Sequence, residues 1–287
     1  MTELVVYGGR ILEVRVSGPS DGLPVMFHHG TPGTLPTRGL ERAVHDRGLR
    51  LITFSRPGYA NSTRLPGRAV ADTVADCAAV LRMVGADRFY LAGWSGGGPH
   101  ALACAALVPG AVRTLVIAGL APYPGTDLDF TAGMSPDDLA EWNAAVQGEA
   151  QLRAHVATAA AVLTGEPADD RGADGQHQLP PADAMALTGE FAADLSAANR
   201  DALHPGIDGW VDDELAFVKP WGFDLGQVDT PVSIWHGSDD RSVPFTHGRW
   251  LAAHLRDASL HRAAGDGHLS VFAQRLDQML DGLLAPQ

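Results

Sequence analysis

The sequence predicts an α/β protein in which a mostly parallel central sheet is flanked by helices and carries an inserted helical cap. Short apolar runs alternate with helix-compatible segments up to residue 118, a pattern typical of βαβ units and a parallel sheet. The alternation stops over residues 122–223 and resumes after them. We therefore expect one core, formed by residues 1–121 and 224–287, and a cap formed by residues 122–223.

The chain is expected to begin with an antiparallel hairpin. Residues 4–7 and 10–16 flank the turn signal Gly8-Gly9, and the second run partly alternates apolar and polar side chains. The apolar runs that follow are short and end in turn residues, which predicts buried strands. The next expected elements are a strand at 24–28, a helix at 40–48 and a strand at 49–54.

A helix is expected over residues 70–84, where apolar side chains recur with a period of about 3.6 residues. A short buried strand over residues 89–92 then leads into a helix over residues 96–108. The same alternation continues on both sides of the insertion. The remaining expected elements are strands at 112–118, 232–235 and 259–262, and helices at 245–255 and 269–284.

The insertion has a sequence of its own kind. Residues 136–147 and 149–163 are helix-like, and a later apolar-acidic stretch holds several aromatic and carboxylate side chains. A run rich in glycine, aspartate and proline covers residues 165–175 and predicts a mobile loop. Because there is no internal repeat and no linker between independent domains, we expect this segment to cover one edge of the sheet.

Composition limits the classes of partner. The chain has 287 residues, of which 45% are hydrophobic and 19% charged, a profile typical of globular proteins. Its formal net charge of −13 repels phosphate backbones and anionic lipid. We therefore expect a small-molecule substrate as the partner, and neither a nucleic acid nor a membrane. The oligomeric state, monomer or homodimer, stays open.

Cysteine usage and the first residues bear on location. Two cysteines, Cys77 and Cys104, are too few for a disulfide framework and are expected to be small buried side chains. The start of the chain lacks the basic segment and apolar run of a signal peptide. No apolar stretch approaches the roughly eighteen residues of a membrane span. We expect a cytoplasmic protein.

A nucleophile is predicted where the sequence reads Gly93-Trp94-Ser95-Gly96-Gly97, the pattern G-x-S-x-G. A serine hydroxyl is a poor nucleophile, and a sharp turn from strand to helix exposes it to a base at the cost of a strained backbone. Here a predicted strand precedes the pattern and a predicted helix follows it. The sequence therefore predicts Ser95 as the nucleophile.

An oxyanion hole is expected beside this serine. The helix after Ser95 has free backbone N–H groups at its start, so the N–H of Gly96 is the first candidate donor. A second donor should come from a loop at the end of an earlier strand. The turn-rich segment after residues 24–28 makes the N–H of Thr31 that candidate, with His29 holding the loop.

The base is expected in a loop at the carboxyl ends of the strands, where an open α/β sheet builds its site. His268 lies in such a glycine-rich loop, between the last strand and the C-terminal helix. The acid that orients it should follow another strand, and both Asp239 and Asp240 do so. No metal site is expected: the histidines that recur every seven residues fall on a helix, a strand and loops.

The chain resembles the α/β-hydrolase superfamily over essentially its whole length. The resemblance rests on the order Ser95, Asp240, His268 and on the early His29-Gly30 loop. It assigns the orienting acid to Asp240, the third residue after the glycine of an H-G-x-x-D-x-x-x-P stretch, with Asp239 as the alternative. It further implies a catalytic triad, a helical lid over residues 122–223, and acyl transfer without a metal or organic cofactor.

The resemblance leaves the branch of the family open. The loop through Thr31 is similar to the H-G-x-P-G loop of proline iminopeptidases, but Thr31 replaces their usual glycine and Gly96 stands where they have tryptophan. Dehalogenases and epoxide hydrolases of this fold use aspartate where this chain has Ser95. We expect a carboxylesterase-like hydrolase of an ester, thioester or lactone. The alternatives are a proline iminopeptidase-like aminopeptidase, a cofactor-free haloperoxidase or perhydrolase, a cyclase, and a ligand-binding protein.

Aromatic side chains around the serine and in the insertion predict an apolar pocket, which suits an uncharged substrate. The candidate substrate contacts are Trp94, Trp142, Trp210, Phe217 and Trp221. Four acidic residues of the insertion offer another interpretation: they bind a substrate amine, or they form a solvated helix start. These residues are Asp208, Asp212, Asp213 and Glu214, and we expect the solvated helix start.

Overall fold

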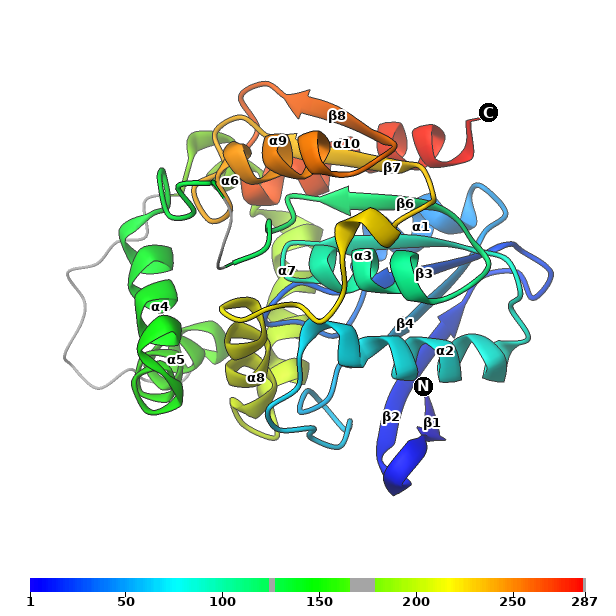
Figure 1. The fold of residues 1–287 in the computed structure, drawn as a ribbon, viewed down its shortest axis with the longest axis horizontal. Coiled ribbons are helices and arrows are strands. Elements are labelled where there is room, and N and C mark those ends of the chain that lie inside the picture. The colour runs from blue at the N-terminus through cyan, green and yellow to red at the C-terminus, as the bar shows by residue number, and fades with distance from the viewer. Residues whose placement is uncertain (124–126, 166–178, 286–287) are drawn as a thin grey trace.

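The computed structural model describes residues 1–123, 127–165 and 179–285, and its centre is one eight-stranded sheet (Figure 1). The strand order is β1-β2-β4-β3-β5-β6-β7-β8. β2 pairs antiparallel with β1 and with β4, and all other neighbours are parallel. The strands are β1 (Thr2–Val5), β2 (Ile11–Ser17), β3 (Pro24–His28), β4 (Arg50–Phe54), β5 (Phe89–Trp94), β6 (Ala111–Ile117), β7 (Val232–Gly237) and β8 (Ala258–Ala263).

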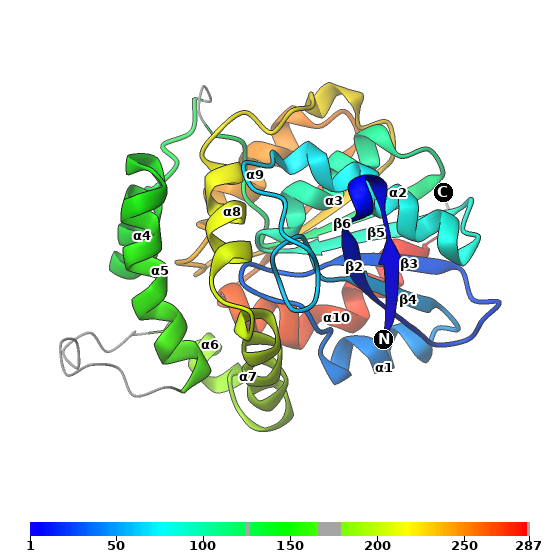
Figure 2. The ribbon, with the colours of Figure 1, turned by 90° about the horizontal axis from the view of Figure 1, so that it is seen from below.

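Helices cover both faces of this sheet, with α1 and α10 on one face and α2, α3 and α9 on the other (Figure 2). Strand β3 explains why both faces are apolar: Val25 and Phe27 point to the first face and Met26 to the second. A strand buried on both sides needs such an unbroken apolar run. The core helices are α1 (Arg38–His45), α2 (Thr73–Val84), α3 (Gly97–Leu107), α9 (Phe245–His254) and α10 (His268–Leu284).

The mostly parallel sheet flanked by helices confirms the predicted fold class. Each predicted core strand and helix is present, with ends that differ by a few residues. One refinement concerns residues 70–84, where a short 3-10 turn, η2 (Val70–Asp72), precedes α2. Two further 3-10 turns are η1 (Tyr7–Gly9), within the N-terminal hairpin, and η3 (Leu225–Gln227), before β7.

Among the described residues between β6 and β7, five helices gather at one end of the sheet (Figures 1 and 2). They are α4 (Pro136–Gln147), α5 (Glu149–Thr164), α6 (Pro181–Ala186), α7 (Gly189–Leu203) and α8 (Asp208–Phe217). Helix α4 has the bounds that the sequence predicts, because Ser135 caps its start by accepting a hydrogen bond from the N–H of Asp138. We use "cap" for α4–α8, while the division at residues 122 and 223 stays a prediction.

The structure bears on the predictions about a loop in the insertion, the two cysteines and membrane-spanning helices. The loop expected at residues 165–175 lies, from residue 166 onward, outside the described residues. Cys77 and Cys104 are free and buried, as expected. Within residues 1–123, 127–165 and 179–285, no helix combines the length and the apolar character that crossing a membrane requires.

Candidate active site

Ser95 occupies the sharp turn between β5 and α3. Its backbone φ of 55° is one that residues other than glycine rarely adopt. Hydrogen bonds fix this turn on both sides, because its N–H donates to the carbonyl of Ile117 and its carbonyl accepts from the N–H of Gly98. The neighbours must be small: a Cβ on Gly97 would lie 2.1 Å from the carbonyl oxygen of His28. Strand and helix therefore approach closely enough to hold the serine in its strained conformation.

His268 begins α10, and its Nδ1 lies 2.8 Å from Oδ2 of Asp240. The other oxygen of Asp240 accepts the N–H groups of Ser242 and Val243, which fixes the carboxylate. Burial acts to lower the pKa of His268, but the charge and hydrogen bond of Asp240 outweigh it and raise the pKa above its ordinary value. Asp239 is exposed and accepts a hydrogen bond from Ser238 instead.

A cavity of about 180 Å³ brings the predicted residues together. Ser95, Gly96, Thr31 and His268 all line it. Gly96 and Thr31 face each other so closely that a Cβ on Gly96 would lie 2.3 Å from Oγ1 of Thr31. The cavity therefore joins the partly buried serine, the imidazole and the two expected oxyanion donors in one space.

Buried hydrogen bonds hold the loop that carries Thr31. Arg56 is 1% exposed and donates to the carbonyl oxygens of His29 and Gly30 at 2.6 and 2.9 Å. It also donates to the hydroxyl of Thr31, which in turn donates to Asp213. Nε2 of His29 accepts the backbone N–H of Arg56. This loop is thus tied to the turn after β4 and to cap helix α8.

The expectation of a solvated acidic helix start at α8 is wrong for Asp212 and Asp213, whereas Asp208, the first residue of α8, is partly exposed. Asp213 is fully buried and pairs with Arg56 and Arg68, each at 2.6 Å, while Asp212 is 2% exposed and pairs with Arg64. Burial acts to raise the pKa of Asp213, but the two guanidinium groups hold it well below its usual range. The arginines lie about 150 residues earlier in the chain, so local sequence gives no sign of the pairing.

Two of the five candidate aromatic contacts line the cavity, namely Trp142 and Phe217. The structure places the other three elsewhere. Trp94 stacks on Phe272 and on His268, with ring centroids 4.5 and 5.8 Å apart. It therefore packs against one face of the imidazole ring. Trp210 is buried in the cap and donates to Glu141, and Trp221 stacks on Phe223 in the core. Large aromatic side chains are buried in hydrophobic cores as well as in pockets, so their presence in the sequence did not locate the pocket.

Three carboxyl groups also line the cavity: Asp138, Glu141 and Glu214. Burial raises the pKa of Glu141 to about 7 and, together with Glu141 and other carboxylates, raises that of Glu214 well above its ordinary value. Burial also raises the pKa of Asp138. Sequence analysis named Glu214 but missed the other two, although their spacing of three residues on α4 places them on one helix face.

Sequence analysis also missed Asp183, a residue of α6. Its carboxylate accepts hydrogen bonds from the N–H groups of His268, Leu269 and Ser270 at 2.9, 3.1 and 2.8 Å. The hydroxyl of Ser270 donates to the same carboxylate at 2.6 Å. Asp183 is 1% exposed and lies 85 positions from His268 in the chain, so no local pattern could reveal these contacts.

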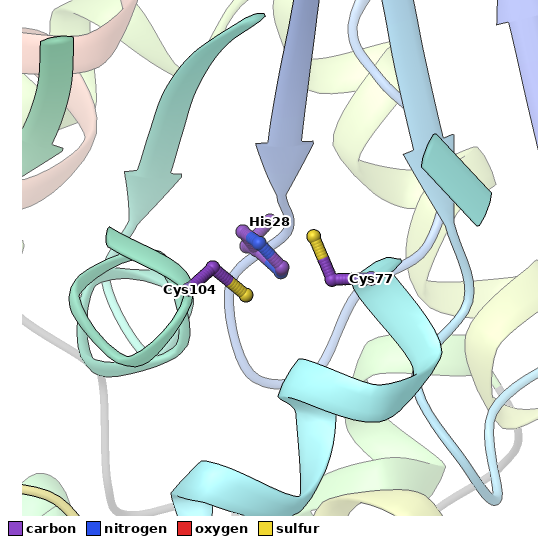
Figure 3. A group of neighbouring side chains, drawn as sticks. All are labelled: His28, Cys77 and Cys104. Atoms are coloured by element: carbon purple, nitrogen blue, oxygen red, sulfur yellow. The ribbon is translucent and has the colours of Figure 1, made fainter. Parts of the chain in front are cut away.

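In the part of the chain that the structure describes, one group of side chains has the spacing of metal ligands. The ligand atoms of His28, Cys77 and Cys104, from β3, α2 and α3, lie within 4.8 Å of one another (Figure 3). Soft metal ions bind thiolate, but burial raises the pKa of Cys104 well above its ordinary value and so favours the neutral thiol. We interpret this group as part of the core packing, since none of its members lines the cavity.

Comparisons with known proteins agree with this architecture. The alpha/beta hydrolase fold family matches residues 24–273. A pimeloyl-[acyl-carrier protein] methyl ester esterase of Aromatoleum aromaticum is 29% identical over 228 residues, which cover 77% of this chain and 81% of that protein. An uncharacterized hydrolase, YcgS, of Bacillus subtilis is 27% identical over 115 residues, and the match covers only 40% of its length and of this chain. The crystal structure of a bromoperoxidase from Bacillus anthracis superimposes with a TM-score of 0.72 at 20% identity, covering 99% of both chains.

Proposed function

The chain belongs to the alpha/beta hydrolase fold family, and on that basis we propose that it is a serine hydrolase acting on a small ester-type substrate. One observation carries the proposal. Ser95, held at a φ of 55°, shares a cavity with His268. Nδ1 of the His268 ring lies 2.8 Å from Oδ2 of Asp240. A serine that lines a cavity, an imidazole and a buried carboxylate in this relation are the components of acyl transfer.

The proposed reaction has two steps. Ser95 Oγ attacks the substrate carbonyl while His268 takes its proton, and the Asp240 carboxylate stabilises the imidazolium that forms. The N–H groups of Gly96 and Thr31 stabilise the developing oxyanion, each by about 100- to 1,000-fold in rate. His268 then protonates the leaving alcohol, which departs and leaves an acyl-enzyme. Water, deprotonated by His268, hydrolyses that ester and releases the carboxylic acid.

The size and relatives of the site support a small carboxylic ester. The cavity has a volume of about 180 Å³, which is below the roughly 300–1,000 Å³ of pockets that hold drug-sized ligands, so it suits a small substrate. The relative from Aromatoleum aromaticum is named a methyl ester esterase, which favours a carboxylic ester over a thioester or a lactone as the substrate. The likeness to the bromoperoxidase is one of fold at 20% identity and gives no support to halide chemistry.

The acidic wall of the cavity favours a second candidate, an aminopeptidase-like hydrolase whose substrate carries an amine on its acyl part. Burial raises the pKa of Glu141 to about 7, so about half of this group is protonated at neutral pH, and burial also raises the pKa of Glu214 well above its ordinary value. A bound ammonium group would favour their ionised forms and so gain binding energy. The apolar pocket expected from the sequence did not include these carboxyl groups.

Activity of wild type and Ser95→Ala against p-nitrophenyl esters of increasing chain length, with proline p-nitroanilide alongside, tests both candidates. Ester turnover that Ser95→Ala abolishes would support the esterase, and the chain-length profile would give the size of the acyl pocket. Preference for the anilide would favour the aminopeptidase. Full ester activity in Ser95→Ala would refute the proposal. A fluorophosphonate probe adds a substrate-independent check, because only an activated serine reacts.

A further inference from the structure

Asp183 joins the cap to the residue that we propose as the general base. It projects from α6 onto the first turn of α10, where three backbone N–H groups and the Ser270 hydroxyl donate to it. The first N–H groups of a helix have no partner within the helix, and a carboxylate there also interacts favourably with the helix dipole. Since α10 begins at His268, the capped turn is the one that carries the imidazole.

The residue before His268 is adapted to this contact. A Cβ on Gly267 would lie 2.4 Å from Oδ2 of Asp183, so only glycine permits the carboxylate to approach. The N–H of Gly267 donates to Ser270 Oγ, which links it to the same set of hydrogen bonds. The turn is thus built around the carboxylate of Asp183.

The core holds a different part of His268. Asp240 binds Nδ1 of the ring, and Trp94 stacks on the ring face. Among the described residues, the backbone N–H of His268 has Asp183 as its hydrogen-bond partner. The ring is therefore oriented by the core, and the position of its Cα is set by a side chain of the cap.

We propose that Asp183 is a positioning residue that fixes His268 for catalysis, so that the base is in place only while α6 is docked against α10. This inference rests on the proposed function, in which His268 accepts the proton of Ser95. The negative charge of Asp183 has a second effect: it contributes to raising the pKa of His268, together with Asp240 and Asp138.

Asp183→Asn is the variant that tests this role. The amide keeps the shape but removes the charge and replaces one acceptor with an NH₂ group that faces backbone donors. We expect kcat to fall about 100-fold, the cost of a displacement on the order of 1 Å in a catalytic group, with KM nearly unchanged. The acidic limb of the kcat/KM profile should move to lower pH, because loss of the negative charge lowers the pKa of His268.

Asp194→Asn is the matched control. Asp194 lies in cap helix α7 and accepts the N–H and Nε of Arg38, the first residue of α1. It is likewise a cap aspartate at the start of a core helix, but α1 carries no residue of the proposed triad. We expect this variant to lose stability at most, with kcat and the pH profile as in wild type.

The outcomes distinguish failure of the positioning role of Asp183 from failure of the proposed serine-hydrolase function. Undiminished turnover in Ser95→Ala would overturn the proposed function whatever Asp183 does. Inactive Ser95→Ala, combined with an Asp183→Asn variant that loses only thermal stability and keeps its kcat and pH profile, would overturn the positioning role alone. If Asp183→Asn does not fold, Ser270→Ala decides, since it removes one donor to the carboxylate: a smaller fall in kcat supports the role, and a wild-type kcat refutes it.

Discussion

Adjacent aspartates in this chain have different surroundings. Asp240 is buried, with one oxygen on backbone N–H groups and the other on His268, whereas Asp239 is exposed and its carboxylate accepts a hydrogen bond from the neighbouring Ser238. Residue type and spacing alone left the two equivalent, because both follow the same strand. The family resemblance pointed to Asp240, whose carboxylate lies 2.8 Å from Nδ1 of His268 in the structure.

This difference predicts the effect of two matched substitutions. Asp240→Asn should lower kcat by about 10,000-fold, because an amide at this position favours the wrong tautomer of the histidine and does not stabilise the imidazolium. Asp239→Asn should leave kcat near the wild-type value. Steady-state kinetics on one p-nitrophenyl ester measures both. Equal losses in the two variants, or none in either, would contradict the assignment of Asp240.

At the scale of elements, sequence periodicity located those that bury a regular apolar face. The strand at 24–28 and the helix at 136–147 were predicted with the bounds that β3 and α4 have. It did not identify α6 or α7, and it wrongly predicted that Asp212 and Asp213 of α8 are solvated. These parts are fixed by contacts with residues far away in the chain, such as Asp213 with Arg56, and local pattern carries no information on them.

The buried ion pair of Asp213 with Arg56 holds helix α8. We expect the Asp213→Asn variant to unfold at a lower denaturant concentration than wild type. Removing one partner of a buried ion pair leaves the other charge uncompensated, which costs about 3–5 kcal/mol. Because the folded pKa of Asp213 lies below its unfolded value, its ionisation stabilises the fold above about pH 4, and this contribution is lost as the pH falls further.

Urea unfolding between acidic and neutral pH measures both effects. The stability of Asp213→Asn should depend less on pH in the acidic range than that of wild type. Asp229→Asn is the control, since Asp229 pairs with Arg256 at an exposed site where an ion pair contributes little. A loss of the same size in the two variants would contradict a special role for the buried pair.

At the scale of the whole molecule, charge should select among substrates. The chain carries a formal net charge of −13, and three of its carboxyl groups line the cavity beside the proposed nucleophile. The field of such a protein attracts cations and repels anions, and salt weakens both effects. Of three p-nitrophenyl esters matched in size, we therefore expect the cationic one to have the highest kcat/KM and the anionic one the lowest, with differences that shrink as ionic strength rises.

The pH dependence of this preference identifies the group responsible. With a pKa of about 7, the ionised fraction of Glu141 rises from about a tenth near pH 6 to about nine-tenths near pH 8. The ratio of kcat/KM for the cationic and neutral esters should rise by about tenfold over that range, because titration of His268 affects both esters and cancels in the ratio. Glu141→Gln should remove this rise, while Glu149→Gln, at an exposed position of α5, should keep it. A ratio that is constant with pH in wild type would show that the acidic wall does not contact the substrate.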